Sequence, residues 1–242
     1  MLEKVSSFLR KAKNTTCSVV VVAAGRSERM GEDKLFMDLA GMPVLARTLE
    51  ALSQCSFVDE IVLVTREESL QRCADLCKAR GFDKVNKVVI GGASRSESVL
   101  RGLVEIRRDA KLVLIHDGAR PLVTEDLVRR VMHTAALYKC AAPAVPLTDT
   151  VKESEGETVV RTLERDRLSA IQTPQGFVPE IIKAALTKGL REKKEFTDDC
   201  AAVEAMGIPV RLTEGSAENI KITRPLDLQT AELYLKNRSA AP

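Results

Sequence analysis

A loop with three cations directly follows an apolar run near the start of the chain. Residues 18–22 are rich in β-branched side chains, which predicts a buried strand. Gly25 permits a turn after that strand, and Arg26, Arg29 and Lys34 follow it. Such a loop lets backbone N–H groups approach phosphate oxygens while the cations neutralise them. Because open α/β sheets bind ligands at the carboxyl ends of their strands, we expect a triphosphate-binding loop of a nucleotide enzyme.

Two common phosphate-binding motifs are absent from this loop. A Walker A sequence requires Gly-x-x-x-x-Gly-Lys-Ser/Thr, and none occurs. The dinucleotide fingerprint Gly-x-Gly-x-x-Gly is not met, because Ser27 and Met30 occupy its second and third glycine positions. An ordinary turn carrying solvated charges is therefore an open alternative.

Two further polar clusters follow strand-like runs. Gly91 and Gly92 free the backbone to approach a ligand, and Arg95 beyond them is suited to sugar or phosphate oxygens. Asp117 follows the apolar residues 112–115. Mg²⁺ favours one or two carboxylates together with substrate phosphates. We therefore predict that Asp117 is a magnesium ligand beside the phosphate loop.

Two cations outside the loop are candidates for anion binding. Arg120 lies three residues beyond Asp117 and is expected to clamp an anion. Lys221 alternates with Ile220 and Ile222, so in an extended segment it faces the opposite side from them. A lysine in such a place is usually a solvated charge, unless the segment lies beside the phosphate loop.

Strand-like runs alternate with amphipathic stretches along the chain. The strand-like runs are residues 18–22, 61–64, 88–90, 112–115, 141–145 and 210–212. The helical patterns are residues 44–52, 69–80, 96–107, 125–138, 180–190 and 198–206, and a last helix follows Pro225. This alternation predicts an α/β fold with a largely parallel sheet and right-handed crossovers. The short continuous apolar runs fit strands that are covered on both faces.

Residues 148–162 interrupt the alternation. Two polar arms with β propensity flank the segment 155–157, which is typical of a hairpin turn. An isolated two-stranded hairpin is marginally stable in water. We therefore expect a projecting arm that pairs with a second subunit, and a loose surface hairpin is the alternative.

Composition limits the class of protein. A chain of 242 residues suits one large α/β domain or one and a half small ones. A net charge of +3, 3% aromatic residues and the absence of Trp argue against a nucleic-acid partner. No apolar stretch approaches the roughly 20 residues of a membrane span. Residues 1–14 lack the continuous apolar core of a secretory signal.

The cysteines and histidines favour no metal centre. Six cysteines are scattered without a Cys-x-x-Cys spacing, and only two histidines occur. Free buried thiols in a reducing cytoplasm account for them best. We expect a cytoplasmic protein, or one of an organelle stroma if the N-terminal extension is a targeting remnant.

The order of the motifs resembles that of the 2-C-methyl-D-erythritol 4-phosphate cytidylyltransferases of the non-mevalonate isoprenoid pathway. The matching segments are residues 23–25, 29–31, 34, 91–92, 95, 98–99, 116–121, 149–152, 165, 173–175, 197–199 and 218–225. The resemblance implies a single Rossmann-like nucleotidyltransferase domain with a protruding β-arm used in dimerisation. The domain is expected over residues 18–237, with the arm at about 146–172, an N-terminal extension over 1–17 and a tail over 238–242.

The resemblance also implies a reaction and a set of site residues. The phosphate of methylerythritol phosphate attacks the α-phosphorus of CTP, and pyrophosphate leaves. The implied catalytic residues are Arg29, Lys34 and Lys221. The implied CTP-binding residues are Ala23, Ala24, Gly25, Gly91, Gly92, Ser98, Asp117 and Gly118. The implied substrate-binding residues are Arg120, Thr150, Arg165, Thr173 and Thr197.

The implied partners are CTP, a polyol phosphate, Mg²⁺ at Asp117 and a second copy of the chain that shares the active site. The attacking phosphate is already anionic, so no general base is needed. We therefore expect His116 to be structural.

The loop departs from the family pattern at several positions. It is shorter than usual between Arg29 and Lys34, and Asp33 stands where a proline commonly precedes the lysine. Ser27 stands where a glycine is often found, and Gly118 replaces an alanine. We therefore expect the contacts with the β- and γ-phosphates to differ in detail.

Three other functions compete with this interpretation. A ribitol 5-phosphate cytidylyltransferase shares the CTP half of the site and differs in the alcohol pocket. A sugar-1-phosphate nucleotidyltransferase would use UTP or GTP. A non-catalytic nucleotide-sensing module is disfavoured, because Arg29, Lys34, Asp117 and Lys221 are all present.

Overall fold

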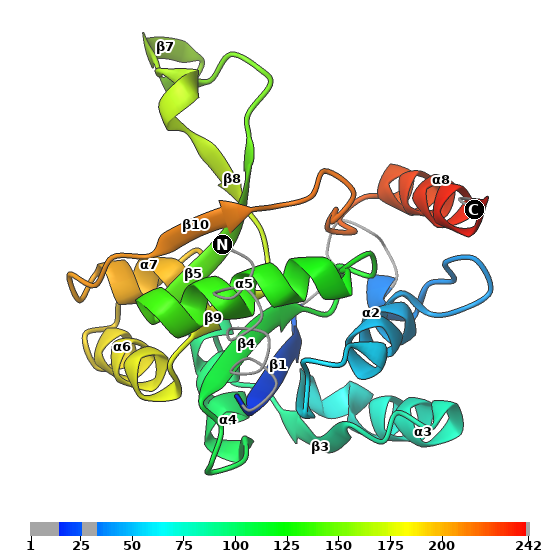
Figure 1. The fold of residues 1–242 in the computed structure, drawn as a ribbon. Helices are drawn as coiled ribbons and strands as arrows, with labels where there is room; N and C mark the ends of the chain where they lie inside the picture. Colours follow the sequence, from blue (N-terminus) through cyan, green and yellow to red (C-terminus); the bar gives the residue numbers. More distant parts are fainter. Residues whose placement is uncertain (1–14, 26–32, 241–242) are drawn as a thin grey trace, which may run out of the picture.

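The computed structural model describes residues 15–25 and 33–240, which form a mostly parallel sheet with helices on both faces (Figure 1). Its strands are β1 (Cys17–Ala23), β2 (Glu60–Thr65), β3 (Val85–Ile90), β4 (Leu112–Asp117), β5 (Cys140–Pro146), β6 (Lys152–Glu155), β7 (Thr158–Thr162), β8 (Ser169–Ile171), β9 (Gln175–Phe177) and β10 (Arg211–Glu214). Its α-helices are α2 (Val44–Gln54), α3 (Leu70–Arg80), α4 (Arg95–Glu105), α5 (Glu125–Tyr138), α6 (Pro179–Arg191), α7 (Asp199–Glu204) and α8 (Pro225–Ala240). Short 3₁₀ turns are η1 (Lys34–Phe36), η2 (Glu67–Ser69) and η3 (Arg165–Arg167).

The main sheet has eight strands, and seven of them follow the order β10-β5-β9-β4-β1-β2-β3, with β8 beside β5. The predicted strands pair in parallel wherever they are neighbours, which confirms the largely parallel α/β fold. The sequence did not predict β8 and β9, which run antiparallel to their neighbours. Each has only three residues, too few to show a period.

The first strand is buried on both faces, as its β-branched run predicts. Val19 and Val21 belong to a core cluster that α2, α3 and α5 cover. Val20 belongs to a second cluster, which α4, α6 and α7 cover on the other face. The centre of the sheet is therefore rigid. The edge strand β3 begins at Val85, earlier than its apolar part predicts, because its outer residues need not be buried.

Helix α4 starts where the third strand's loop ends. Ser94 caps the helix by accepting a hydrogen bond from the backbone N–H of Glu97 at 3.1 Å. The Glu97 carboxylate in turn accepts from the N–H of Ala93 at 2.9 Å. These reciprocal bonds satisfy donors that an uncapped helix would leave free. They fix the N-terminus of α4, and with it Arg95, at the carboxyl edge of the sheet.

The segment before α8 runs alongside the loop after β4. The N–H of Ile222 donates to the carbonyl of Ala119 at 2.8 Å. Ile222 is fully buried with Leu39, Val44, Leu122 and Ala231 in a third cluster. This packing brings Lys221 to the same edge of the sheet as β1 and β4. Helix α8 continues through residue 240, so residues 238–240 extend a helix.

The hairpin projects from the body of the molecule (Figure 1). Within the described ranges, strands β6 and β7 pair only with each other, and all of their residues are exposed. Gly156 turns between them with a φ of +56°, in the left-handed region that glycine tolerates best. The predicted projecting hairpin is confirmed, and its use in dimerisation stays a prediction. None of the helices in the described ranges is long and apolar enough to span a membrane.

Candidate active site

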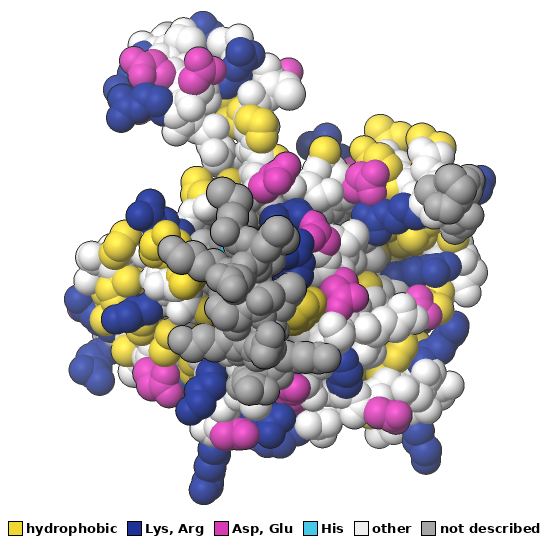
Figure 2. Space-filling model, viewed as in Figure 1, with side chains coloured by type: hydrophobic (Ala, Val, Ile, Leu, Met, Phe, Trp, Pro, Cys, Tyr) yellow, Lys and Arg dark blue, Asp and Glu magenta, His cyan; other side chains and the backbone are white. Residues whose placement is uncertain are grey.

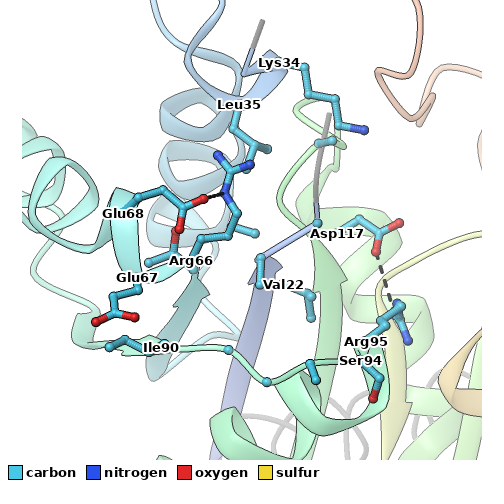
Figure 3. A pocket seen from close by; sticks show the side chains of 18 of the residues that line it. Val22, Lys34, Leu35, Arg66, Glu67, Glu68, Ile90, Ser94, Arg95 and Asp117 are labelled. Carbon is cyan, nitrogen blue, oxygen red and sulfur yellow. Dashed lines mark ion pairs between the residues drawn. The ribbon is translucent and has the colours of Figure 1, made fainter. Parts of the chain in front are cut away.

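A cavity of about 560 Å³ opens at the carboxyl ends of β1, β2, β3 and β4 (Figure 3). Its lining consists of Val22, Ala23, Ala24, Gly25, Lys34, Leu35, Thr65, Arg66, Glu67, Glu68, Ile90, Gly91, Gly92, Ala93, Ser94, Arg95, Asp117, Ala119 and Lys221. The parallel register explains why these segments meet. Val22 pairs with Asp117, Ala23 with Thr65, and Thr65 with Ile90, so all four strands end at one level.

The glycine loop after β3 lies against the loop after β1. A Cβ on Gly91 would lie 2.7 Å from both the Ala24 Cβ and the Ser98 Oγ, so only glycine fits there without a shift. The N–H of Gly92 donates to the Ser98 Oγ at 3.0 Å. Ser98 is buried and does not line the cavity. Its hydroxyl shapes the loop whose backbone faces the opening.

Asp117 is the central anion of the site. Its Oδ2 lies 2.9 Å from the Lys221 Nζ and 3.7 Å from the Arg120 Nε, and its Oδ1 lies 3.8 Å from Arg95. Burial by itself raises the pKa of Asp117, but the three cations outweigh burial and lower that pKa to about 2. The carboxylate is therefore ionised at neutral pH. Its side chain is 11% exposed, so it meets the cavity at one edge only.

Arg95 lies between two carboxylates. Its Nη2 donates to the Asp199 Oδ2 at 2.7 Å, and Asp199 is fully buried at the start of α7. Figure 3 shows Arg95 turned from the start of α4 toward Asp117. The buried Asp199 thus fixes the Arg95 guanidinium on the side away from the cavity, and Arg95 itself lines the cavity.

His116 and Thr173 form a buried pair behind Asp117. The Thr173 hydroxyl lies 3.0 Å from the His116 Nδ1 and accepts a hydrogen bond from the N–H of Asp117 at 3.1 Å. The other ring nitrogen of His116 lies 3.2 Å from the carbonyl of Arg120. Burial lowers the pKa of His116 to about 4, so the ring is neutral at pH 7. His116 is therefore structural, as expected.

The cations at the opening come from distant parts of the chain. Lys34 lies in η1, where Leu35 anchors the turn in the core. Lys221 precedes α8, and its side chain is 42% exposed. Both line the cavity with Asp117. Arg29, expected beside them, lies outside the described residues.

Comparison with known proteins identifies the family. The family model for 2-C-methyl-D-erythritol 4-phosphate cytidylyltransferase matches residues 17–237. The chain belongs to this family. Membership makes it an enzyme, a CTP-dependent nucleotidyltransferase of isoprenoid biosynthesis.

Similar cytidylyltransferases cover nearly the whole chain. One from Caldanaerobacter subterraneus is 42% identical over 223 residues, which span 90% of this chain and 98% of that protein. One from Dehalococcoides mccartyi strain CBDB1 is 44% identical over 225 residues, 92% of this chain and 97% of that protein. The crystal structure of the 4-diphosphocytidyl-2C-methyl-D-erythritol synthase of Anaerococcus prevotii is 31% identical, with a TM-score of 0.81 over 92% of this chain and 99% of that one.

The residues expected to bind CTP lie at or near one cavity. Ala23, Ala24, Gly25, Gly91, Gly92 and Asp117 line it. Gly118 does not. Its N–H donates to the carbonyl of Val22 at 2.9 Å, which ties the end of β4 to β1. The cavity is thus lined by small and glycine residues of the loops after β1 and β3 and by the charged side chains of Lys34, Asp117 and Lys221.

The residues expected to bind the second substrate are not brought together within one chain. Thr150 and Arg165 line a separate hollow of about 480 Å³ on the arm, where the Arg165 Nη1 donates to the carbonyl of Thr148 at 2.7 Å. Thr197 lines a third hollow, of about 420 Å³, beside α7 and β10.

Two further expected substrate residues, Thr173 and Arg120, are held by neighbouring groups rather than lining the cavity. Thr173 is 5% exposed behind Asp117. The Arg120 Nη1 donates to the carbonyl of Asn219 at 2.7 Å. Arg120 therefore ties the loop after β4 to the segment that carries Lys221.

Sequence reasoning missed Arg66, which lines the cavity from the end of β2. No recognisable motif surrounds it. Its position was nevertheless a usable signal, because Arg66 follows the predicted strand 61–64 almost as Asp117 follows the run 112–115. Parallel strands end at the same edge, so charged residues after each of them are candidates for one site.

The donor set suits magnesium only when phosphate is present. The described residues contain no group of three or more His, Cys, Asp and Glu that would hold a metal ion by themselves. Asp117 offers one ionised carboxylate at the edge of the cavity. One carboxylate plus phosphate oxygens is a common way for proteins to bind Mg²⁺. The site therefore fits a cation that arrives with a nucleotide.

Proposed function

We propose that the cavity between Lys34, Asp117 and Lys221 is where the protein transfers CMP from CTP to 2-C-methyl-D-erythritol 4-phosphate. One observation carries the proposal: segments nearly 190 residues apart place two lysines and an ionised aspartate around one cavity, in a chain of this family. The products are 4-diphosphocytidyl-2-C-methyl-D-erythritol and pyrophosphate.

The reaction forms one P–O bond and breaks another. A phosphate oxygen of the substrate attacks the α-phosphorus of CTP, and the bond from that phosphorus to the bridging oxygen of the β-phosphate breaks. The electron pair of the broken bond leaves with pyrophosphate. Because the nucleophile is an anion, the protein's work is positioning and charge stabilisation rather than proton removal.

The lysines stabilise charge at the two ends of the reacting group. Lys34, with Arg29, would hold the triphosphate and the leaving pyrophosphate. Lys221 would bridge the α-phosphate and the attacking phosphate, leaving its ion pair with Asp117 as it does so. The backbone of Gly91 and Gly92 would face the cytosine, where an edge-on pyrimidine fits better than a purine.

Asp117 is the residue that would hold Mg²⁺. The ion would supply positive charge that neutralises the phosphates and strengthens the electrophilic character of the α-phosphorus. The side chains of Lys221, Arg95 and Arg120 keep the carboxylate ionised and oriented in advance.

The second substrate site is proposed to form across a homodimer. Thr150 and Arg165 lie on the projecting arm, away from the cavity of their own chain. Val159 and Val160 on the same arm are more than half exposed, an apolar surface that a partner would cover. Figure 2 shows the arm standing clear of the body, with charges of both signs on its visible face. In the dimer, the partner's Arg165 would clamp the substrate phosphate.

A reducing cytoplasm is the proposed compartment. All six cysteines are buried and free of disulfides. Proteins of oxidising compartments would more often pair them.

The proposed reaction is tested by pyrophosphate release from the purified protein. The assay pairs each of CTP, UTP, GTP and ATP with 2-C-methyl-D-erythritol 4-phosphate and with ribitol 5-phosphate, in the presence of Mg²⁺. We expect turnover with CTP and methylerythritol phosphate only. Higher kcat/KM with ribitol 5-phosphate would select the pentitol alternative, and comparable turnover with GTP would exclude the proposed nucleotide site.

A further inference from the structure

Lys34 is the first residue of η1, a turn too short to be stable without contacts to the rest of the protein. The turn η1 has three residues, and a 3₁₀ turn of that length gains little from its own hydrogen bonds. Its position must come from contacts of the residues around Lys34. Two of these are hydrophobic or aromatic: Leu35 is buried in the core, and the guanidinium of Arg72 lies 3.7 Å from the centre of the Phe36 ring.

Asp33 supplies the polar contacts at the start of the turn. Its Oδ1 accepts a hydrogen bond from the N–H of Leu35 at 3.3 Å, which caps η1. Its Oδ2 pairs with the Nη2 of Arg66. One carboxylate thus performs two separate tasks, one within the turn and one across to β2.

The Asp33–Arg66 ion pair is partly buried, and Arg66 is attached to a buried strand. The side chains of Asp33 and Arg66 are 21% and 18% exposed, so water screens their attraction less than at an open surface. Arg66 directly follows β2, whose six residues are all buried. A fixed strand end therefore anchors the residue that immediately precedes Lys34.

The Arg66 side chain is directed at the turn η1 and away from Arg95 and Asp117. Figure 3 shows its guanidinium turned toward η1, across the opening from Arg95 and Asp117. The Nε lies 3.2 Å from a Glu68 carboxylate oxygen, and the Nη2 donates to the Ser69 Oγ at 3.3 Å. With Asp33, these contacts engage the Nη2 and Nε atoms of the guanidinium.

We propose that the Asp33–Arg66 ion pair is a positioning device that sets the place of Lys34 at the cavity. The inference rests on the proposed function, because it acts through the charge of Lys34 on the triphosphate. The fixing comes from the ion pair to the end of β2 and from the hydrogen bond that caps η1. Neither Asp33 nor Arg66 needs to touch the nucleotide.

Two single variants and their combination test the pair. Asp33→Ser keeps a good helix-capping side chain but removes the charge, and Arg66→Met keeps an apolar stem without the guanidinium. We expect each to lower kcat on the order of ten-fold, because small misplacements of a reacting group are costly. The double variant should lose no more than either single variant. Glu105→Ser, which breaks the 2.8 Å pair between Lys87 and Glu105 away from the cavity, should leave kcat unchanged.

The Lys34→Ala background separates positioning from a general effect on the fold. If Asp33 acts through Lys34, adding Asp33→Ser to Lys34→Ala should lower kcat no further. A further ten-fold loss there, or wild-type kcat in Asp33→Ser, would overturn the inference. So would a much larger loss in Arg66→Met than in Asp33→Ser, which would make Arg66 a direct phosphate ligand.

Failure of the proposed function gives a different pattern. Wild-type kcat in Lys34→Ala would show that Lys34 is outside the reacting site, and the positioning inference would then fall with it. A reduced kcat in Lys34→Ala together with wild-type kcat in Asp33→Ser and Arg66→Met would reject the positioning inference and leave the proposed function intact. Asp33→Asn, which keeps the size of the side chain, serves in place of Asp33→Ser if circular dichroism shows that the serine variant is unfolded.

Discussion

Asp117 shows how neighbouring charges decide what one residue can do. Burial alone would favour its protonated form, but Lys221, Arg95 and Arg120 lower its pKa to about 2, below the ordinary 3.8. The folded-state pKa is the lower one, so the carboxylate stabilises the fold above pH 4 and loses that contribution as pH falls from 3.8 toward 2. At working pH it is a fixed negative charge, suited to a cation and unsuited to proton transfer.

His116 should not titrate in the neutral range. Its pKa is lowered by burial from 6.5 to about 4, so the ring stays neutral in the fold and begins to destabilise it only as pH falls from 6.5 toward 4. The chain has two histidines, which makes a ring NMR titration simple to assign with a His133→Gln variant. We expect the His116 ring signals, the only histidine signals left in His133→Gln, not to shift between pH 5 and 8. A His116 signal that shifts near pH 6.5 would contradict its structural role.

Lys221 should matter for catalysis much more than for stability. Its side chain is 42% exposed, so its truncation should disturb little packing. Its positive charge, by contrast, would stabilise the negative charge that develops on the phosphates in the transition state. We expect Lys221→Ala to lower kcat by roughly 100-fold with an unchanged circular dichroism spectrum. Lys188→Ala is the matched control, because Lys188 is similarly exposed on α6 and lies away from the cavity. Near-wild-type kcat in Lys221→Ala would show that the site is misplaced.

The elements contribute to the site through where they end. The parallel register brings the last residues of β1, β2, β3 and β4 to one level, so four loops surround one opening. The antiparallel strand β9 lies beside β4 and does not end at the cavity. It pairs with β4 and β5 and leads from Thr173 behind Asp117 to α6. The short strand β9 thus positions Thr173 against Asp117, while the ends of the parallel strands line the cavity.

Two glycines at this edge should respond differently to a methyl group. A Cβ on Gly91 would lie 2.7 Å from the Ala24 Cβ, whereas the nearest atom to a Cβ on Gly118 is 3.2 Å away, at the tip of Leu45. We expect Gly91→Ala to displace the loop and lower kcat/KM for CTP at least about ten-fold, and Gly118→Ala to change it less than about three-fold. Steady-state kinetics with CTP varied distinguishes them. Equal effects would mean that the backbone of Gly91 does not contact the nucleotide.

At the scale of the whole molecule, strands β6 and β7 of the arm pair only with each other among the residues that the structure describes. Every residue of β6 and β7 is exposed, and an isolated two-stranded hairpin is marginal in water. Thr150 and Arg165 flank β6 and β7 in the sequence and line a hollow on the arm. A second copy of the chain would both cover the arm and receive these residues.

Mixing two inactive variants tests the shared site. Lys221→Ala and Arg165→Ala would each be inactive alone, because every site then lacks one residue. After random subunit exchange, half of the dimers are mixed, and each mixed dimer has one intact site of two. Activity should therefore recover to about a quarter of wild type, as two-fold symmetry requires.

The exchange itself needs an independent control. Mass spectrometry of differently tagged chains shows whether mixed dimers have formed. Mixed dimers without recovered activity would place Arg165 in the site of its own subunit, and the arm would then serve association alone.

The sequence alone determined the fold class, most elements and the loops that carry the chemistry. Continuous apolar runs such as residues 18–22 and 112–115 are typical of strands covered on both faces, and their order with helices leaves few topologies. The polar residues after these runs follow from the same pattern. The sequence alone therefore places Gly91, Gly92 and Asp117 at the carboxyl edge of the sheet.

Only the tertiary structure decided which side chains act on one another. Arg66 and Asp33 lie far apart in sequence and meet through strand ends, and Arg95 reaches Asp199 on α7 across the sheet edge. The three-residue strands β8 and β9 also escaped prediction, because so short a segment has no period. Local pattern fixes which residues face the core, whereas pairing of charges depends on distances that arise only when distant segments pack together. For this reason the lysines that we propose as catalytic could be named from the sequence, and the contacts that hold them could not.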